Sequence, residues 1–206
     1  MANRRYHILF SDIGGVLGTN GWDTRLRRKI AARYSLNVEE LERRHHLMFD
    51  SFERGYMSFE DYLGHVFFEQ QRSFTVDEIR DFAFSESVAW PDCIDLLRRV
   101  KTLNGLKLAL ISNEGEGLTN YRVRAWGLRE LADFLIFSYC VHMRKPDRAM
   151  WQLGLDVAQA RPEESIYIDD RPMFVEIAGN LGFTAIQHVS VESTRDQLAR
   201  LGLAVD

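Results

Sequence analysis

The chain has 206 residues, of which 46% are hydrophobic and 27% charged, and its formal net charge is −4. These proportions are typical of a globular protein with one sizeable core, and they exclude a fibre or a disordered tail. Because the charge balance is acidic, it offers no electrostatic footprint for nucleic acid or for an anionic membrane surface, and we expect neither as a partner.

The first predicted element is a short apolar run at residues 8–10, which leads directly to Asp12 and then to two glycines, Gly14 and Gly15. Such a run, bounded by turn signals, predicts a strand buried on both faces. The glycines indicate a sharp turn or a close approach of the backbone. Ligands of open α/β sheets bind at the carboxyl ends of strands, so Asp12 is a candidate catalytic carboxylate. Taken alone, this motif favours an aspartate that caps a turn, and only the rest of the chain reverses that preference.

Residues 22–87 follow and read as helical throughout, with apolar residues such as Leu41, Met48 and Phe52 at helical spacing. Four short amphipathic helices in succession predict a small bundle that packs against itself and against a neighbour. We expect its aromatic residues to form the core of this bundle, rather than a substrate cage. These residues are Phe49, Phe52, Phe59, Tyr62, Phe67 and Phe68.

The second half of the chain alternates strands and helices. The predicted strands span residues 106–112, 134–138, 166–170 and 184–188, and the predicted helices span 91–103, 118–126, 148–158, 173–181 and 193–201. This alternation predicts an α/β fold with a parallel sheet covered by helices on both faces, which the first strand must join. We expect a core formed by residues 1–18 and 91–206, with a helical insert at 19–90.

Polar residues follow several of the predicted strands or lie in a loop that leads to a helix. They are Asp12, Ser112, Asn113, Lys145, Asp169 and Asp170. The carboxyl ends of parallel strands share one edge of the sheet, where these carboxylates would repel one another unless a divalent cation is bound. Oxygen ligands of this kind suit Mg²⁺. A lysine and a hydroxyl beside them suit a phosphoryl group, and Asp12 is then a candidate nucleophile.

Four motifs in this order resemble those of the haloacid dehalogenase (HAD) superfamily of hydrolases. The motifs are Asp12-Ile-Gly-Gly-Val-Leu17, Leu110-Ile-Ser112-Asn113, Arg144-Lys145-Pro146-Asp147 and Tyr167-Ile-Asp-Asp170-Arg-Pro. The resemblance covers nearly the whole chain and implies a Rossmann-like core with an inserted helical cap. The segment from Arg54-Gly55 to Tyr62 is similar to a cap segment of a branch that includes sugar-1-phosphate phosphatases and the phosphatase domain of soluble epoxide hydrolases.

The resemblance also implies a role for each motif residue. Asp12 would be the nucleophile and a Mg²⁺ ligand, with the Gly14 carbonyl as a second ligand. Asp170 would bind the metal directly, and Asp169 directly or through water. Ser112, Asn113 and Lys145 would hold the phosphoryl oxygens, and Lys145 would also steady Asp12. The implied activity is a Mg²⁺-dependent phosphatase acting on a small phosphorylated metabolite, with sugar phosphates as one candidate class.

Gly14 departs from the pattern, because most phosphatases of this superfamily have there an aspartate that protonates the leaving group. Such general acid–base help is worth about 10²–10⁴ in rate. Three explanations stay open: a leaving group that needs little help, such as an anomeric oxygen; another acid, Glu114 or Glu116; or a catalytically impaired binding protein. If Gly14 requires a positive φ, an aspartate in its place would be strained.

Other reactions remain as alternatives. The same Asp12 could displace halide from a 2-haloacid, although that chemistry needs no metal and leaves Asp169 and Asp170 unexplained. A phosphonatase would need a cap lysine for a Schiff base, and Lys29 is the only lysine in the predicted cap. A non-catalytic module that binds a sugar phosphate or a protein is a further alternative. Asn20 and Trp22 would face the site if the cap closes, whereas Arg144 and Arg171 are equally consistent with structural ion pairs.

The two cysteines, Cys93 and Cys140, are far apart and have no metal-binding spacing. No segment has the length of a membrane span, and the first residues do not read as a signal peptide. We therefore expect a cytoplasmic protein, either a monomer or a homodimer, whose partner is a small phosphorylated metabolite.

Overall fold

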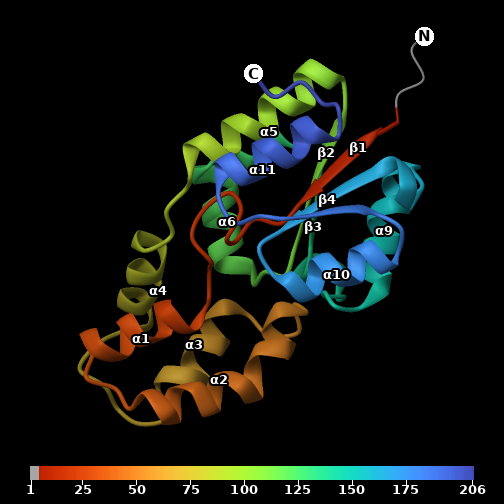
Figure 1. Ribbon diagram of the computed structural model, residues 1–206. Helices are drawn as coiled ribbons and strands as arrows, with labels where there is room; N and C mark the ends of the chain where they lie inside the picture. The colour runs from red at the N-terminus through yellow and green to blue at the C-terminus, as the bar shows by residue number, and fades with distance from the viewer. Residues whose placement is uncertain (1–4) are drawn as a thin grey trace.

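The computed structural model describes residues 5–206, and a parallel sheet of five strands lies at its centre (Figure 1). The strands are β1 (Ile8–Ser11), β2 (Lys107–Ser112), β3 (Phe134–Phe137), β4 (Ser165–Asp169) and β5 (Thr184–Gln187). Their order across the sheet is β3-β2-β1-β4-β5, so the chain builds outward from one side of β1 and then crosses to the other. The resulting switch point lies between β1 and β4, where open α/β sheets bind ligands.

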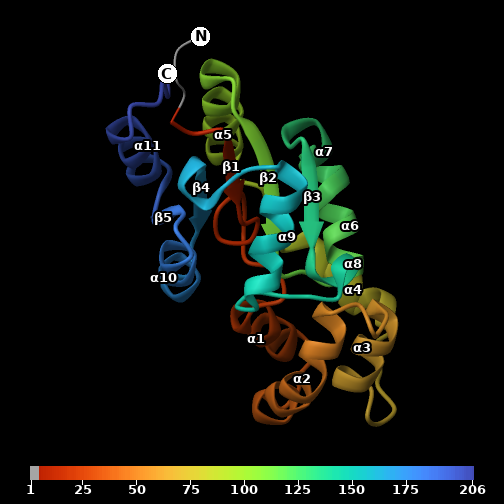
Figure 2. The same ribbon diagram turned by 90° about the vertical axis from the view of Figure 1, so that its right-hand side faces the viewer.

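Helices cover both faces of this sheet, as Figure 2 shows. One face packs against α5 (Pro91–Asn104), α6 (Glu116–Ala125) and α11 (Val191–Arg200), and the other against α9 (Arg148–Ala158) and α10 (Pro172–Asn180). All four residues of β1 are buried, which explains why its first three, Ile8, Leu9 and Phe10, are apolar without alternation, and the buried Ser11 hydroxyl donates to the Asp12 carbonyl at 2.8 Å. The predicted α/β fold with a doubly covered parallel sheet is confirmed.

Three short helical elements were not expected from the sequence. They are α7 (Leu128–Leu131), α8 (Ser138–Val141) and the 3₁₀ helix η1 (Pro162–Glu164). Each is too short to show a helical period, so hydrophobic spacing cannot reveal it. The predicted strand at 134–138 ends one residue early, because Ser138 already belongs to α8.

Residues 24–85 contain α1 (Thr24–Arg33), α2 (Val38–Glu53), α3 (Phe59–Phe67) and α4 (Val76–Ser85), which share a hydrophobic cluster of their own. Each helix begins where a side chain caps it. The side chains of Asp23, Asn37, Ser58 and Thr75 each accept a hydrogen bond from the backbone N–H three residues on. Thr75 and Glu78 form the reciprocal pair of a capping box.

Two connections that run side by side join these helices to the sheet. Gly18 and Ala89 form an antiparallel bridge, the Thr19 N–H donates to the Val88 carbonyl at 2.9 Å, and the Trp90 N–H donates to the Leu17 carbonyl at 2.8 Å. The chain therefore leaves and re-enters the sheet region at one place. The division at residues 18 and 91 into a core and a cap stays a prediction.

Among residues 5–206, no helix combines the length and the apolar character that crossing a membrane requires. The expected compartment and the expected monomer or homodimer stay predictions.

Candidate active site

Three carboxylates meet at the switch point of the sheet. Asp12 follows β1, while Asp169 ends β4 and Asp170 comes next, and one oxygen from each lies within 4.8 Å of the others. The backbone holds them in place, because the Asp12 N–H donates to the Ile168 carbonyl and the Asp169 carbonyl accepts from the His188 N–H, both at 2.9 Å. Within the described part of the chain, this is the one such group of three potential metal-binding side chains.

Lys145 connects two of these carboxylates. The side chain comes from the loop between α8 and α9 and is only 1% exposed. Its Nζ donates to Asp12 Oδ1 at 3.0 Å, to Asp169 Oδ2 at 2.6 Å and to the Tyr167 hydroxyl at 3.1 Å. Burial opposes the charge of Lys145, but Asp12, Tyr167 and Asp169 outweigh it and raise the Lys145 pKa well above its usual range. The site therefore contains a buried ammonium group that stays charged.

Asp12 has an unusual environment for a carboxylate. Burial from water raises the pKa of Asp12 to about 7, with a contribution from the negative charge of Asp169, while Lys145 and a hydrogen bond from Ser112 act in the opposite direction. Further positive charge beside Asp12 would favour its ionised, nucleophilic form.

The oxygens of Asp170 provide the test of whether a metal ion fits. Asp170 Oδ1 is buried and has no hydrogen-bond partner, whereas Oδ2 accepts from Asn20 Nδ2 at 3.1 Å. Asp169 is fully engaged, since Oδ1 accepts from the Arg171 N–H at 2.9 Å and Oδ2 accepts from Lys145 and Tyr167. An orphaned carboxylate oxygen next to Asp12 fits a hard cation such as Mg²⁺. Gly14, the predicted carbonyl ligand, lines the same pocket.

Ser112 and Asn113, at the end of β2, also reach this pocket. The Asn113 amide forms a reciprocal pair with the backbone of Lys145: Nδ2 donates to the Lys145 carbonyl and Oδ1 accepts from the Lys145 N–H, both at 2.7 Å. Its side chain thus positions the loop that carries Lys145. The Ser112 hydroxyl lies between Asp12 and Glu114 Oε1, 3.2 Å from the latter, and its single proton can be donated to either carboxylate.

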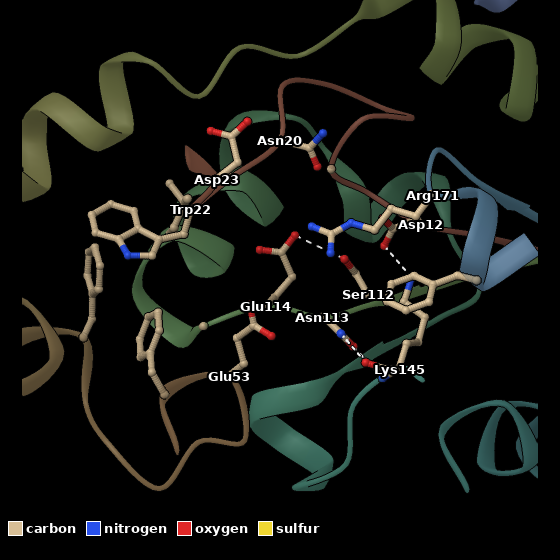
Figure 3. Close-up of a pocket in the computed structure, with 17 residues that line it drawn as sticks. Asp12, Asn20, Trp22, Asp23, Glu53, Ser112, Asn113, Glu114, Lys145 and Arg171 are labelled. Carbon is tan, nitrogen blue, oxygen red and sulfur yellow. Dashed lines mark hydrogen bonds and ion pairs between the residues drawn. The ribbon is translucent and has the colours of Figure 1, made fainter. Parts of the chain in front are cut away.

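The pocket lies between this edge of the sheet and the helices of residues 24–85 (Figure 3). Its other wall is aromatic and includes Trp22, Phe52 and Phe59. The Trp22 indole N–H donates to the Tyr62 hydroxyl, so the ring is held by the helical bundle. Asn20 and Trp22 reach the pocket as expected. Phe52 and Phe59 belong both to the bundle core and to the pocket wall, so the expectation that they serve only the bundle was incomplete.

The family model for haloacid dehalogenase-like hydrolases matches residues 6–182, which is most of the chain. The chain belongs to this family. Known structures agree in fold.

A predicted HAD-like family hydrolase from Porphyromonas gingivalis is 19% identical, with a TM-score of 0.78 over 96% of this chain and 98% of that one. The HAD family enzyme bt-2542 from Bacteroides thetaiotaomicron, solved with magnesium and inorganic phosphate, is 20% identical with a TM-score of 0.72, over 88% of this chain and 93% of that one. L-2-haloacid dehalogenase from Xanthobacter autotrophicus, with chloropropionic acid covalently bound, is 18% identical with a TM-score of 0.61, over 97% and 84%.

In this HAD-like hydrolase, neither Glu114 nor Glu116, the two residues considered as a replacement acid, is placed as a free acid in the pocket. Glu114 is buried and lines the pocket, but Oε1 pairs with Arg122 at 3.0 Å and Oε2 accepts from the Thr119 hydroxyl at 3.1 Å. Arg122 is itself fully buried and donates to the Ser87 hydroxyl and the Thr19 carbonyl. Glu116 is exposed and does not line the pocket.

A carboxyl that the sequence did not single out does line the pocket. Glu53, the last residue of α2, pairs through Oε2 with Arg144 at 2.6 Å. Burial raises the pKa of Glu53, although Arg144 opposes the shift. In the sequence, only its position two residues before Gly55, near the end of a helical stretch, distinguishes it. Arg144 is thus engaged in ion pairs, while Arg171 lines the pocket and lies 5.6 Å from the centre of the Phe174 ring.

The two glycines after Asp12 play different parts. Gly15 has a φ of +74°, and a Cβ there would lie 2.3 Å from Asp170 Oδ2, so only glycine fits. Gly14 is not among the residues with a positive φ, and a Cβ there would meet the end of the Asn20 side chain at 2.9 Å. The left-handed backbone considered for Gly14 therefore occurs one residue later, and the missing acid at position 14 is not a backbone requirement.

Proposed function

We propose that this HAD-like hydrolase is a Mg²⁺-dependent phosphatase that acts on small phosphorylated metabolites through an aspartyl-phosphate on Asp12. The observation that carries the proposal is the group of Asp12, Asp169 and Asp170 with Lys145 between the first two and a partnerless oxygen on Asp170. A cation beside a buried ammonium group suits a dianionic phosphoryl group. The magnesium and phosphate in bt-2542, an enzyme of similar fold, support the same pair of ligands.

In the first step an Asp12 oxygen attacks phosphorus as the bond from phosphorus to the ester oxygen breaks. Mg²⁺, held by Asp12, the Gly14 carbonyl and Asp170, would supply positive charge that offsets the charge on the phosphoryl oxygens. Lys145 holds Asp12 in place through Oδ1 and adds its own charge beside the phosphoryl group. Ser112 and Asn113 complete this phosphoryl-binding edge from the end of β2.

In the second step water attacks the phosphorus of the aspartyl-phosphate, and the bond to the Asp12 oxygen breaks. Phosphate leaves and the Asp12 carboxylate is restored. The helices of residues 24–85 act as a cap that keeps bulk water from the intermediate and receives the leaving group against Trp22, Phe52 and Phe59. Such a wall suits the apolar face of a small organic group, including a sugar ring.

The similarly folded L-2-haloacid dehalogenase from Xanthobacter autotrophicus was solved with chloropropionic acid covalently bound, and the corresponding reaction in this chain would be halide displacement by Asp12. That reaction leaves a halide ion, so it has no need of a cation. The partnerless Asp170 oxygen would then have no purpose. The acidic group therefore favours phosphoryl transfer over dehalogenation.

The test is hydrolysis of a panel of phosphorylated metabolites, 4-nitrophenyl phosphate and 2-chloropropionate, each with Mg²⁺ and with EDTA. We expect phosphate release that requires Mg²⁺ and no halide release. Asp12→Asn should abolish turnover while its thermal denaturation stays close to that of the wild type, because the amide is nearly isosteric but a poor nucleophile. Phosphate release that survives exhaustive chelation, or halide release without phosphate release, would contradict the proposal.

A further inference from the structure

When a phosphate ester is cleaved, its alcohol part leaves as an alkoxide unless a nearby acid protonates the ester oxygen. Gly14 has no side chain that could supply this proton. In an in-line displacement the leaving oxygen departs on the side of phosphorus opposite the nucleophile. Asp12 attacks from the sheet, so the leaving oxygen emerges toward the helices of residues 24–85. A proton donor is therefore needed on the cap side of the pocket.

Four carboxyl groups line the pocket: Asp12, Asp23, Glu53 and Glu114. Asp12 is the proposed nucleophile. Asp23 caps α1 and its Oδ1 accepts from the Leu26 N–H at 2.9 Å. Both oxygens of Glu114 are engaged, by Arg122 and Ser112 on one side and Thr119 on the other. Glu53 remains.

Glu53 occupies the required side. It ends α2, and Figure 3 shows its carboxyl inside the pocket on the side of the helical region, with Asp12 and Lys145 on the side of the sheet. Arg144 pairs with Oε2 at 2.6 Å, which leaves Oε1 for a ligand in the pocket. Arg144 directly precedes Lys145 in the chain, so the same loop aligns the groups on both sides of the phosphoryl position.

The charges around Glu53 are consistent with a carboxyl that holds a proton. Burial raises the pKa of Glu53 and Glu114 adds to the rise, while Arg144 and Arg171 act in the opposite direction. On its own helix, Asp50 also faces Arg144, at 3.4 Å.

We propose that Glu53 is the general acid and base of this site and takes the part of the aspartate that is replaced by Gly14. This proposal rests on the phosphatase function proposed above. As the bond from phosphorus to the ester oxygen breaks, the Glu53 carboxyl gives its proton to that oxygen, so that an alcohol leaves and Glu53 becomes a carboxylate. The carboxylate then takes a proton from the water that attacks the aspartyl-phosphate. Asp12 returns as a carboxylate, phosphate is released as the hydrogen phosphate dianion, and Glu53 is protonated again.

The test compares Glu53→Gln with the wild type on 4-nitrophenyl phosphate, phenyl phosphate and glycerol phosphate, whose leaving groups become steadily more basic. Glutamine keeps the size and an acceptor for Arg144 but has no acidic proton. We expect kcat on glycerol phosphate to fall by about 10²–10⁴, with a much smaller loss on 4-nitrophenyl phosphate. The wild-type activity should decline as pH rises past the Glu53 pKa, and the variant should lack this decline.

Asp50→Asn is the matched control, because Asp50 lies on the same helix and faces the same arginine but does not line the pocket. It should keep the wild-type dependence on the leaving group. Glu53→Asp retains a carboxyl and should lose less on glycerol phosphate than Glu53→Gln. Thermal denaturation of each variant checks the fold.

Equal losses on all three esters, no loss at all, or the same pattern in Asp50→Asn would overturn the role of Glu53. These outcomes are distinct from failure of the proposed function, in which the wild type itself releases no phosphate from any ester.

Discussion

At the switch point, the residues proposed to take part in the reaction are also tightly constrained by the packing around them. Lys145 is buried with two carboxylates and a tyrosine hydroxyl around one ammonium group. Taking such a charge out of water is costly, and the cost is offset only because its partners are bonded to it. Gly15 has a similar constraint, since any side chain would strike Asp170. The residues nearest the proposed chemistry therefore have the least freedom to change.

Replacing Lys145 by methionine keeps the length of the side chain and removes its charge. The carboxylates of Asp12 and Asp169 then lose their shared partner, and we expect the free energy of unfolding at neutral pH to fall by about 3–5 kcal/mol. Urea denaturation measures it. Lys107→Met is the control, because Lys107 is exposed and its change should stay within about 0.5 kcal/mol. If Lys145→Met lost no more stability than Lys107→Met, the expected cost of leaving Asp12 and Asp169 buried without their shared partner would be contradicted.

At the scale of elements, the helices of residues 24–85 contact the sheet region at several places, including the stacked rings of Phe84 on α4 and Tyr121 on α6, and two of the contacts bear on the shape of the pocket. One is the pair of connections at Gly18 and Ala89. The other is the end of α2, where Arg54 donates to the His142 carbonyl at 3.2 Å and the His142 ring donates to the Arg54 carbonyl at 2.7 Å. Glu53 and Arg144 meet at this second contact. The docking of α2 therefore decides whether Glu53 reaches the pocket.

Inside the bundle, Tyr62 accepts from Trp22 and so donates its hydroxyl proton to His45 Nδ1, which lies 2.7 Å away. Burial lowers the pKa of His45 from 6.5 to about 3, and the nearby Arg27 adds to the shift. Between pH 6.5 and about 3, His45 therefore binds a proton more readily in the unfolded chain than in the folded one. The free energy of unfolding should therefore fall as pH falls from 6.5 toward 3.

The measurement is urea denaturation at several pH values for the wild type and for His45→Gln, whose amide oxygen can still accept from Tyr62. We expect a shallower fall in stability on acidification for His45→Gln. Identical pH dependence in the two proteins would mean that His45 does not contribute.

At the scale of the whole molecule, the acidic group joins distant parts of the chain. Asp12 follows β1 and Asp170 follows β4, and the two come together only when these strands pair in the sheet. The unfolded chain therefore has no such site, so a cation that binds it must stabilise the folded state.

We expect Mg²⁺ to raise the temperature of unfolding, with a gain of about 2.7 kcal/mol when its concentration is one hundred times the dissociation constant. Asp170→Asn should lose most of this gain, because it removes the charge of the carboxylate whose Oδ1 has no partner. Asp196→Asn changes an exposed carboxylate elsewhere and should keep it. Scanning calorimetry with Mg²⁺ and with EDTA measures both, and the same Mg²⁺ shift in Asp170→Asn would exclude Asp170 as a ligand.

Local patterns along the chain are enough to predict the sheet and the polar residues at its edge. Apolar runs that end in Asp12, Ser112 and Asp169 predict parallel strands, and the carboxyl ends of such strands share one edge whatever the details of packing. The helical nature of residues 24–85 was equally evident, because amphipathic spacing and capping residues are local signals.

The side chains that complete the pocket could not be predicted from such patterns, because they depend on how distant segments pack. The Asn113 side chain donates a hydrogen bond to the Lys145 carbonyl, and Glu114 forms an ion pair with Arg122 of α6. Glu53 reaches the pocket from the end of α2. Each depends on how a helix or loop packs against a distant partner, and spacing along the chain carries no record of that packing. The positions of strand-end residues follow from the register of the sheet. The position of Glu53 depends instead on how α2 packs against the loop that carries Arg144, a contact between segments distant in the sequence.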